Sequence, residues 1–148
     1  MRAGQVCLCI GPVLFCLLDG GLTLQGQSDA YWAGDFQQAK ELNPLGRWPL
    51  ERHPLLFGAA LLCWGCVFCT AILRFPARLA RPLSLIVPLG HTLGAASWLV
   101  RLGVLGWLLV LPLLFASRLV FDWAWRRSAP LAKTQLGHER TCPDSTSM

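Results

Sequence analysis

Charged side chains are scarce in this sequence. They make up 14% of its 148 residues, whereas a soluble globular domain carries about 25%. The basic residues are scattered, with no run longer than Arg126-Arg127, so the electrostatic footprint that nucleic-acid binding needs is missing. Glycine-rich phosphate loops and the H-E-x-x-H and G-x-S-x-G motifs are missing as well. We therefore expect neither an ordinary soluble domain, nor a nucleic-acid partner, nor an enzyme of the classes that these motifs mark.

A disulfide framework is also absent, although the chain has seven cysteines. Six of them fall inside apolar runs, where a thiol behaves as a small apolar side chain, and only Cys142 lies in a polar segment. Cys63, Cys66 and Cys69 have the spacing of iron–sulfur ligands, but no fourth cysteine follows nearby and loops normally hold such clusters. We interpret these three as packing residues and predict no cofactor.

Apolar residues, in contrast, are abundant at 54% of the chain. They form four runs that are nearly free of charge over roughly 17 to 20 residues, the length that crosses a hydrocarbon core about 30 Å thick. A single helix over residues 82–121 would be about 60 Å long, so the chain must turn back near Arg101. The sequence thus predicts an all-α fold, an integral membrane bundle of about four transmembrane helices within residues 1–127. The expected spans are about 5–25, 55–73, 82–100 and 102–121.

The first of these runs, behind Arg2, also has the pattern of a signal peptide. No small-x-small cleavage site follows it, and Phe15 stands where a lipoprotein site at Cys16 would need a small residue. We expect a retained first span, with a cleaved signal sequence as the alternative.

A polar loop is predicted over residues 26–54. Asp35 and Gln38 resemble a capping box that opens a short helix over residues 36–42. Asn43-Pro44 is expected to end that helix, because a residue that precedes proline is disfavoured in helical conformation.

The remaining polar stretch, residues 128–148, is aperiodic and is predicted to be a disordered cytoplasmic tail. Lysine and arginine near the ends of the spans set the orientation of a membrane protein. One side collects Arg2, Arg74, Arg78, Arg81, Arg126 and Arg127, and the other collects Lys40, Arg47, Arg52 and Arg101. This bias predicts that both termini are cytoplasmic and that the 26–54 loop lies outside.

Asp19 is the most informative residue, because a carboxylate inside a span is costly and usually faces a bundle interior or a water-filled cavity. Counting 1.5 Å per residue places it about 9 Å below the outer end of its helix. Cys16, Thr23 and Gly26 recur with it at three- and four-residue spacing and form one polar stripe. Two interpretations stay open: Asp19 belongs to a functional site, or it is an interfacial or neutral, hydrogen-bonded group.

His91 lies in the middle of the third span, beside Gly90 and Gly94, whose spacing permits close approach of two helices. Its structural interpretation is a hydrogen bond between helices, for example to Ser84 or Thr23, and its functional one is a site. Because Glu41 returns just before the second span, we expect Asp19 and Glu41 to face one another, with His91 somewhat deeper. The candidate polar cluster is Asp19, Thr23, Glu41, Asn43 and His91, with Pro44, Gly90 and Gly94 as structural residues and no firm metal site.

The segments D-x-x-L-T at Asp19–Thr23 and E-L-N-P at Glu41–Pro44, followed by a phenylalanine-bearing apolar helix, resemble a family of small prokaryotic multi-pass membrane proteins known only as a domain of unknown function. The resemblance covers roughly residues 16–73, and the chain departs from it in a longer insertion over residues 27–40. The resemblance implies a membrane location and a joint importance of Asp19, Thr23, Glu41, Asn43 and Pro44. It implies no reaction.

The expected function is that of a small, non-enzymatic integral membrane protein, a scaffold or assembly subunit of a bacterial inner membrane. The alternative is an intramembrane metal- or proton-binding site, in an enzyme or transporter component, built from Asp19, Glu41 and His91. Carboxylates and imidazole suit either task. The expected partners are the lipid bilayer and either further copies of the chain or other membrane proteins.

Overall fold

The computed structural model describes residues 3–139, with side-chain surroundings for residues 4–128. Every element in this part of the chain is a helix, which confirms the all-α prediction. The four long helices are α1 (Ala3–Gln25), α4 (Pro54–Arg74), α5 (Ala77–Leu99) and α6 (Val104–Glu139). Each is long and apolar enough to cross a membrane, over Gly4–Gln25, Pro54–Arg74, Ala77–Leu102 and Val104–Ser128.

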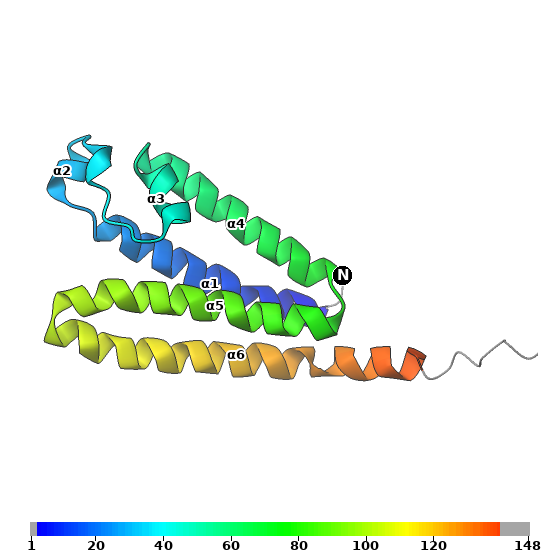
Figure 1. Cartoon of the computed structure of the whole chain (residues 1–148). Helices are drawn as coiled ribbons and strands as arrows, with labels where there is room; N and C mark the ends of the chain where they lie inside the picture. The colour runs from blue at the N-terminus through cyan, green and yellow to red at the C-terminus, as the bar shows by residue number, and fades with distance from the viewer. Residues whose placement is uncertain (1–2, 140–148) are drawn as a thin grey trace, which may run out of the picture.

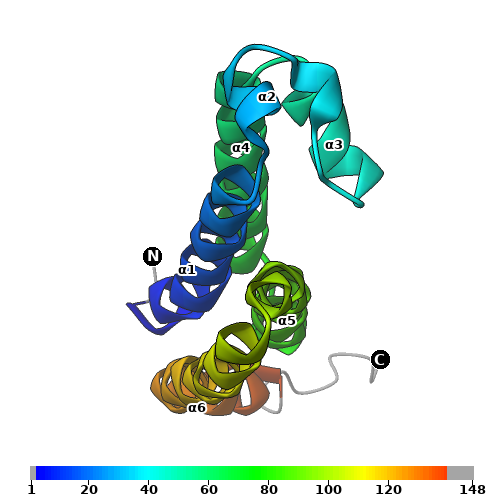
Figure 2. The same cartoon turned by 90° about the vertical axis from the view of Figure 1, so that its left-hand side faces the viewer.

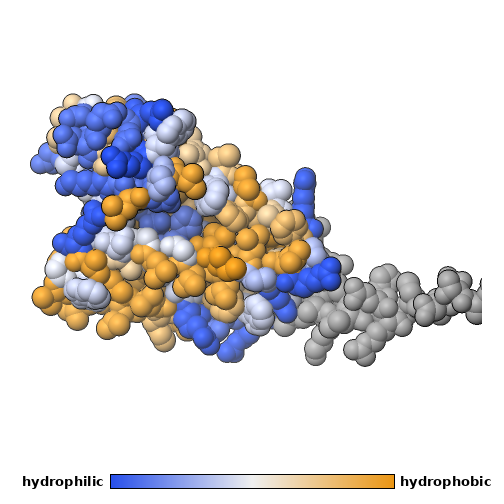
Figure 3. All heavy atoms as spheres, viewed as in Figure 1, coloured by the Kyte–Doolittle hydropathy of each residue, from blue (hydrophilic) through white to orange (hydrophobic). Residues whose placement is uncertain are grey.

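Helix α1 is the central element of the bundle (Figures 1 and 2). It packs most extensively against α5 and also contacts α4 and α6. Its side chains Leu8 and Phe15 are almost completely buried, whereas α4 and α6 leave most of their apolar side chains exposed. Such outward-facing apolar surface is what a bilayer covers, and the space-filling view shows it as a broad apolar band below a hydrophilic cap (Figure 3).

Helices α5 and α6 form the expected hairpin. The short 3-10 helix η2 (Val100–Leu102) continues α5, and Gly103 then turns the chain with φ = +68°, a left-handed conformation that glycine adopts without steric cost. Helix α1 begins, and helix α6 leaves the bundle, at the end opposite to this turn (Figure 1).

The loop between α1 and α4 is more structured than predicted. It contains α2 (Asp29–Trp32), the 3-10 helix η1 (Phe36–Gln38) and α3 (Pro44–Leu50). The predicted helix over 36–42 was wrong, because Asp35 makes no capping hydrogen bond with its side chain and only one short turn forms.

Asn43-Pro44 begins a helix and does not end one. The Asn43 side chain accepts a hydrogen bond from the Leu45 amide at 3.1 Å, and Pro44 occupies the first turn. The restriction that proline places on the preceding residue holds Asn43 in extended conformation, which suits an N-cap as well as it suits a helix end.

Helix α6 also differs from the prediction. It continues beyond Phe121 to Glu139, so the predicted tail is helical from 128 to 139, while 140–148 lie outside the described residues. The segment contains Pro130 and Gly137, the residue types least favourable in a helix interior, so local helix propensity does not explain this extension.

Arginine–tryptophan pairs mark both ends of the bundle. At the loop end, the guanidinium carbons of Arg52 and Arg101 lie 3.8 and 3.9 Å from the ring centres of Trp48 and Trp98. At the other end, the corresponding distances are 4.7 Å for Arg81 over Trp125 and 5.8 Å for Arg127 over Trp123. Amphipathic tryptophan rings prefer the membrane–water interface, and the pairs therefore place the two interfaces at these two levels.

Candidate functional site

Asp19 of α1 and His91 of α5 meet inside the bundle. Oδ2 of Asp19 lies 2.9 Å from Nδ1 of His91, and the two side chains are only 20% and 17% exposed. This contact replaces the predicted partners of His91, since Ser84 donates to the Arg81 carbonyl at 2.7 Å and Thr23 donates to Glu41. A carboxylate and an imidazole thus satisfy one another where lipid could satisfy neither.

Gly94 makes this contact possible. A Cβ atom at position 94 would lie only 2.6 and 2.7 Å from the two carboxylate oxygens of Asp19. Gly90, one turn earlier, has nothing within 4 Å of its corresponding position. The predicted role of this glycine pair in helix approach is therefore carried by Gly94, while Gly90 leaves open space.

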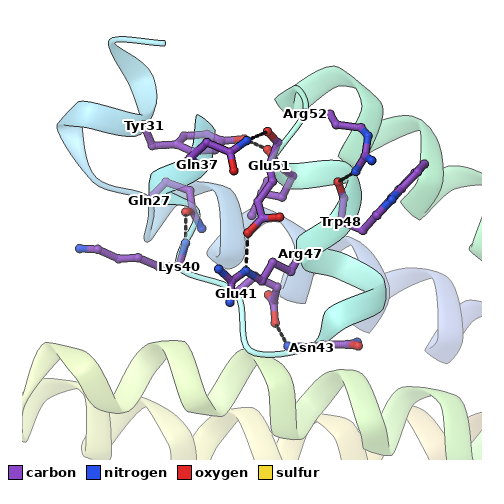
Figure 4. Close-up of polar contacts among 11 residues, drawn as sticks. Gln27, Tyr31, Gln37, Lys40, Glu41, Asn43, Arg47, Trp48, Glu51 and Arg52 are labelled. Carbon is purple, nitrogen blue, oxygen red and sulfur yellow. Dashed lines mark hydrogen bonds and ion pairs between the residues drawn. The ribbon is translucent and has the colours of Figure 1, made fainter. Parts of the chain in front are cut away.

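Glu41 is held over the C-terminal end of α1 by hydrogen bonds at both of its oxygens. The Asn43 amide donates to Oε1 at 2.7 Å, and the Thr23 hydroxyl donates to Oε2 at a longer 3.5 Å. Gln27 fixes the same segment, because its side chain accepts a hydrogen bond from the Lys40 amide at 2.7 Å (Figure 4). The same side chain donates to the Thr23 carbonyl, also at 2.7 Å. Thr23 of α1 and Gln27, which lies just beyond the end of that helix, therefore tie residues 40–43 to the transmembrane helix.

Tyr31 anchors the rest of the loop. It is fully buried, and its hydroxyl donates to the Leu50 carbonyl at 3.1 Å (Figure 4). Burial raises the pKa of the Tyr31 phenol above its usual value of 10.0. Its ring packs edge-on against Phe36 at 5.3 Å, and Leu50 and Phe57 complete the cluster. The loop is thereby a packed cap with its own small core.

A cavity of about 720 Å³ lies beneath this cap, bounded by α1, α3, α4 and α5. In the space-filling view, the surface is hollowed between the hydrophilic cap and the apolar helices (Figure 3). Its polar lining consists of Asp19, Thr23, Glu41, Asn43, His91 and Ser97. Its apolar lining includes Phe57, Leu61, Trp64, Phe68, Ile86 and Val87.

The structure brings all five members of the candidate polar cluster to this cavity, together with Gly90 and Gly94. Pro44 is not part of the wall and acts instead at the start of α3. Asp19 and Glu41 share the cavity, but Asp19 contacts His91 and Glu41 contacts Thr23.

Ser97 and the aromatic wall were missed by the sequence analysis. Ser97 follows Gly90 and Gly94 at helical spacing and could have been found as the third member of that face. The aromatic residues of α4 gave no comparable indication, because they sit in an evenly apolar run.

The cysteines form no metal centre in the described part of the chain. All six described cysteines are free thiols, and no three His, Cys, Asp or Glu side chains there gather as metal ligands. Cys69 packs beside the cluster that contains Cys9, whose thiol lies 3.9 Å from the Cys69 carbonyl oxygen. Cys63 and Cys66 are exposed on α4, so they do not pack within this chain.

Comparisons of the chain with protein-family models, curated proteins and solved structures gave no match.

Proposed function

We propose that this chain is a non-enzymatic scaffold or assembly subunit of a bacterial inner membrane, and that it holds a partner molecule in the cavity at the loop end of its bundle. The cavity carries this proposal. Its volume of about 720 Å³ falls within the roughly 300–1,000 Å³ of ligand pockets, which are mostly apolar with a few convergent polar groups.

Binding without reaction agrees better with the contacts of the lining residues. A hydrolytic site would need a nucleophile hydrogen-bonded to His91 within the cavity. Ser97 donates to the Gly94 carbonyl at 2.6 Å instead. The Cys16 thiol, one turn from Asp19, does interact with His91, but it is buried and does not line the cavity, so a molecule in the cavity would not reach it.

The distribution of charge supports cytoplasmic termini. The end of the bundle that holds the α4–α5 connection carries Arg74, Arg78, Arg81, Arg126 and Arg127. The loop end carries fewer basic residues, namely Lys40, Arg47, Arg52 and Arg101. Excess lysine and arginine is retained on the cytoplasmic side of membrane proteins, so the cavity would open near the outer face.

The resemblance to the small prokaryotic membrane family remains a proposal of the same kind. Its support is that Asp19, Thr23, Glu41 and Asn43, which come from two separate sequence segments, line one cavity.

A second candidate function, proton binding within the membrane, has one observation in its favour. The Asp19–His91 contact of 2.9 Å joins two groups that can share or exchange a proton. Proton binding would take place in the same cavity. Metal binding there has less support, because no three His, Cys, Asp or Glu side chains among the described residues gather as metal ligands.

Native mass spectrometry of the protein released from nanodiscs of bacterial lipid tests the binding function. Gly90→Leu should fill the cavity without a clash at Cβ, whereas Gly65→Leu places the same side chain at a position that also has open space but does not line the cavity. We expect a bound species on the wild type and on Gly65→Leu, and its loss from Gly90→Leu. Identical adducts on all three proteins would show that the cavity holds nothing specific.

A further inference from the structure

The ionisable groups that line the cavity carry mostly negative charge. They are the carboxylates of Asp19 and Glu41 and the imidazole of His91, and no lysine or arginine occurs among the described lining residues. If His91 is protonated, its charge is matched by Asp19 at 2.9 Å. The charge of Glu41 then stays uncompensated within the cavity.

The basic residues of the neighbouring loop have other partners. Arg47 forms an ion pair with Glu51, and the Arg52 side chain donates to the Trp48 carbonyl at 2.8 Å (Figure 4). The Lys40 side chain points away from Glu41 (Figure 4). Arg101, at the outer end of α5, lies over the Trp98 ring. Among the residues whose side chains the structure describes, none is a cation at ion-pair distance from Glu41.

Both carboxylates also retain capacity to accept hydrogen bonds. Oδ1 of Asp19 has no donor among the described residues, and Oε2 of Glu41 has only the distant Thr23 hydroxyl at 3.5 Å. A carboxylate oxygen can accept about two hydrogen bonds. A cationic nitrogen with N–H groups would satisfy these oxygens with charge-assisted bonds, which are roughly twice as strong as neutral ones.

Below these polar groups the wall is apolar. Phe68 and Val87 lie near the middles of α4 and α5. Ile86 and Trp64 are 63% and 45% exposed at the same level, so the cavity meets the surface that faces lipid. A molecule that enters from the outer leaflet with its head uppermost would place its chain along this wall.

We propose that the partner molecule is a cationic amphiphile, with a protonated amine seated between Asp19 and Glu41 and an apolar chain along Phe68 and Val87. This inference rests on the proposed binding function and adds the chemistry of the ligand. An anionic head would oppose Glu41 in a region of low dielectric, and a small hydrophilic amine would leave the apolar wall unfilled.

Photolabelling of the full-length protein in nanodiscs tests the inference. The probes are a twelve-carbon alkylamine with a diazirine on its chain and the matched alkanol and carboxylic acid. We expect the amine to label peptides of α4 and α5 that contain Phe68 and Val87 at least tenfold more than the other two probes. Cavity-filling Gly90→Leu and Ala60→Leu should each abolish this labelling, while Gly65→Leu should leave it unchanged.

Glu41→Gln separates charge from shape. Its amide oxygen can still accept from the Asn43 amide, so the loop keeps its anchor. We expect amine labelling to fall about tenfold and alkanol labelling to stay constant, since tenfold corresponds to about 1.4 kcal/mol.

Two outcomes would overturn the inference in different ways. Equal labelling by amine and alkanol, both abolished by Gly90→Leu, would refute the cationic head and leave the binding function standing. If all three probes label the protein, and neither Gly90→Leu nor Ala60→Leu changes that labelling, these amphiphiles do not occupy the cavity. The proposed binding function would still stand if Gly90→Leu lost the bound species in native mass spectrometry.

Discussion

The Asp19 carboxylate and the His91 imidazole lie 2.9 Å apart although 72 residues separate them in the chain. They belong to α1 and α5, the two helices with the most extensive mutual packing. The pair therefore joins the polar site to the most extensive helix–helix contact of the bundle, and it depends on the register of one helix on the other.

Gly94→Ala should disturb this register. The added Cβ would meet both carboxylate oxygens of Asp19 at less than 2.8 Å, so α1 and α5 must separate or Asp19 must leave His91. We expect a loss of about 1–3 kcal/mol in unfolding free energy, the usual cost of overpacking. Unfolding by SDS in bicelles, followed by circular dichroism, measures it.

Gly90→Ala is the matched control, because its Cβ would meet nothing within 4 Å. It should change the unfolding free energy by less than about 0.5 kcal/mol. Equal effects of the two substitutions would contradict the assignment of Gly94 as the contact glycine.

A double-mutant cycle of Asp19→Ala and His91→Ala measures the pair itself. Because each single substitution leaves the other residue of the pair unpaired in a poorly hydrated site, the double variant should lose less than the sum of the single losses. We expect a coupling of about 0.6–2 kcal/mol, the range for polar contacts between transmembrane helices. Additivity within error would mean that the two groups do not interact in the membrane.

The exposed pair Arg118–Asp122 on α6 provides the comparison. Its atoms are also 2.9 Å apart, but the Arg118 side chain is 72% exposed. A cycle on this pair should give only about 0.3–0.5 kcal/mol. Because the two pairs have the same atom separation, we would attribute a larger coupling free energy at Asp19–His91 to the burial of that pair.

The ionisable residues that line the cavity could be predicted from the sequence, but the contacts between them could not. Asp19 and His91 are visible as ionisable residues in apolar runs, and the number and placement of the spans follow from hydropathy alone. Their pairing depends on the register of α1 against α5, which is set by a tertiary contact at Gly94 and leaves no trace in local pattern.

The loop shows the limit of local patterns most clearly. Asn43-Pro44 fits the end of one helix and the start of the next equally well, so the local sequence could not decide between them. The hydrogen bond from the Lys40 amide to the Gln27 side chain connects positions 13 residues apart, and no sequence-spacing rule predicts it.

The Tyr31 phenol should titrate above its ordinary pKa. Burial disfavours the phenolate, and Tyr31 is the only tyrosine in the chain, so its ionisation can be followed directly by ultraviolet absorbance. We expect the midpoint in the folded protein to lie above 10.0, the usual pKa of a tyrosine phenol, and to return to about 10 in denaturant.

Stability should follow the same titration. Because the folded pKa is raised, the contribution of Tyr31 is fully present below the unfolded pKa of about 10 and is lost as the pH rises through the folded pKa. Tyr31→Phe should lower stability at neutral pH by about 1 kcal/mol, through loss of the hydrogen bond to the Leu50 carbonyl. The unfolding free energy of Tyr31→Phe should lack the part of the decline above pH 10 that Tyr31 causes in the wild type. If the variant and the wild type decline equally, other groups cause the decline.

The proposed orientation predicts which loops are accessible from outside the cell. In a background without native cysteines, Gln38→Cys should react with a membrane-impermeant maleimide in intact cells, because Gln38 is exposed on the loop cap. Arg78→Cys, exposed beside the α4–α5 connection, should react only after the membrane is permeabilised. Since Arg78 itself contributes to the orienting charge, Leu79→Cys serves as a charge-neutral second position on the same exposed turn. Labelling of Leu79→Cys and not of Gln38→Cys in intact cells would invert the orientation and place the cavity near the cytoplasmic face, where a ligand from the outer leaflet could not enter it.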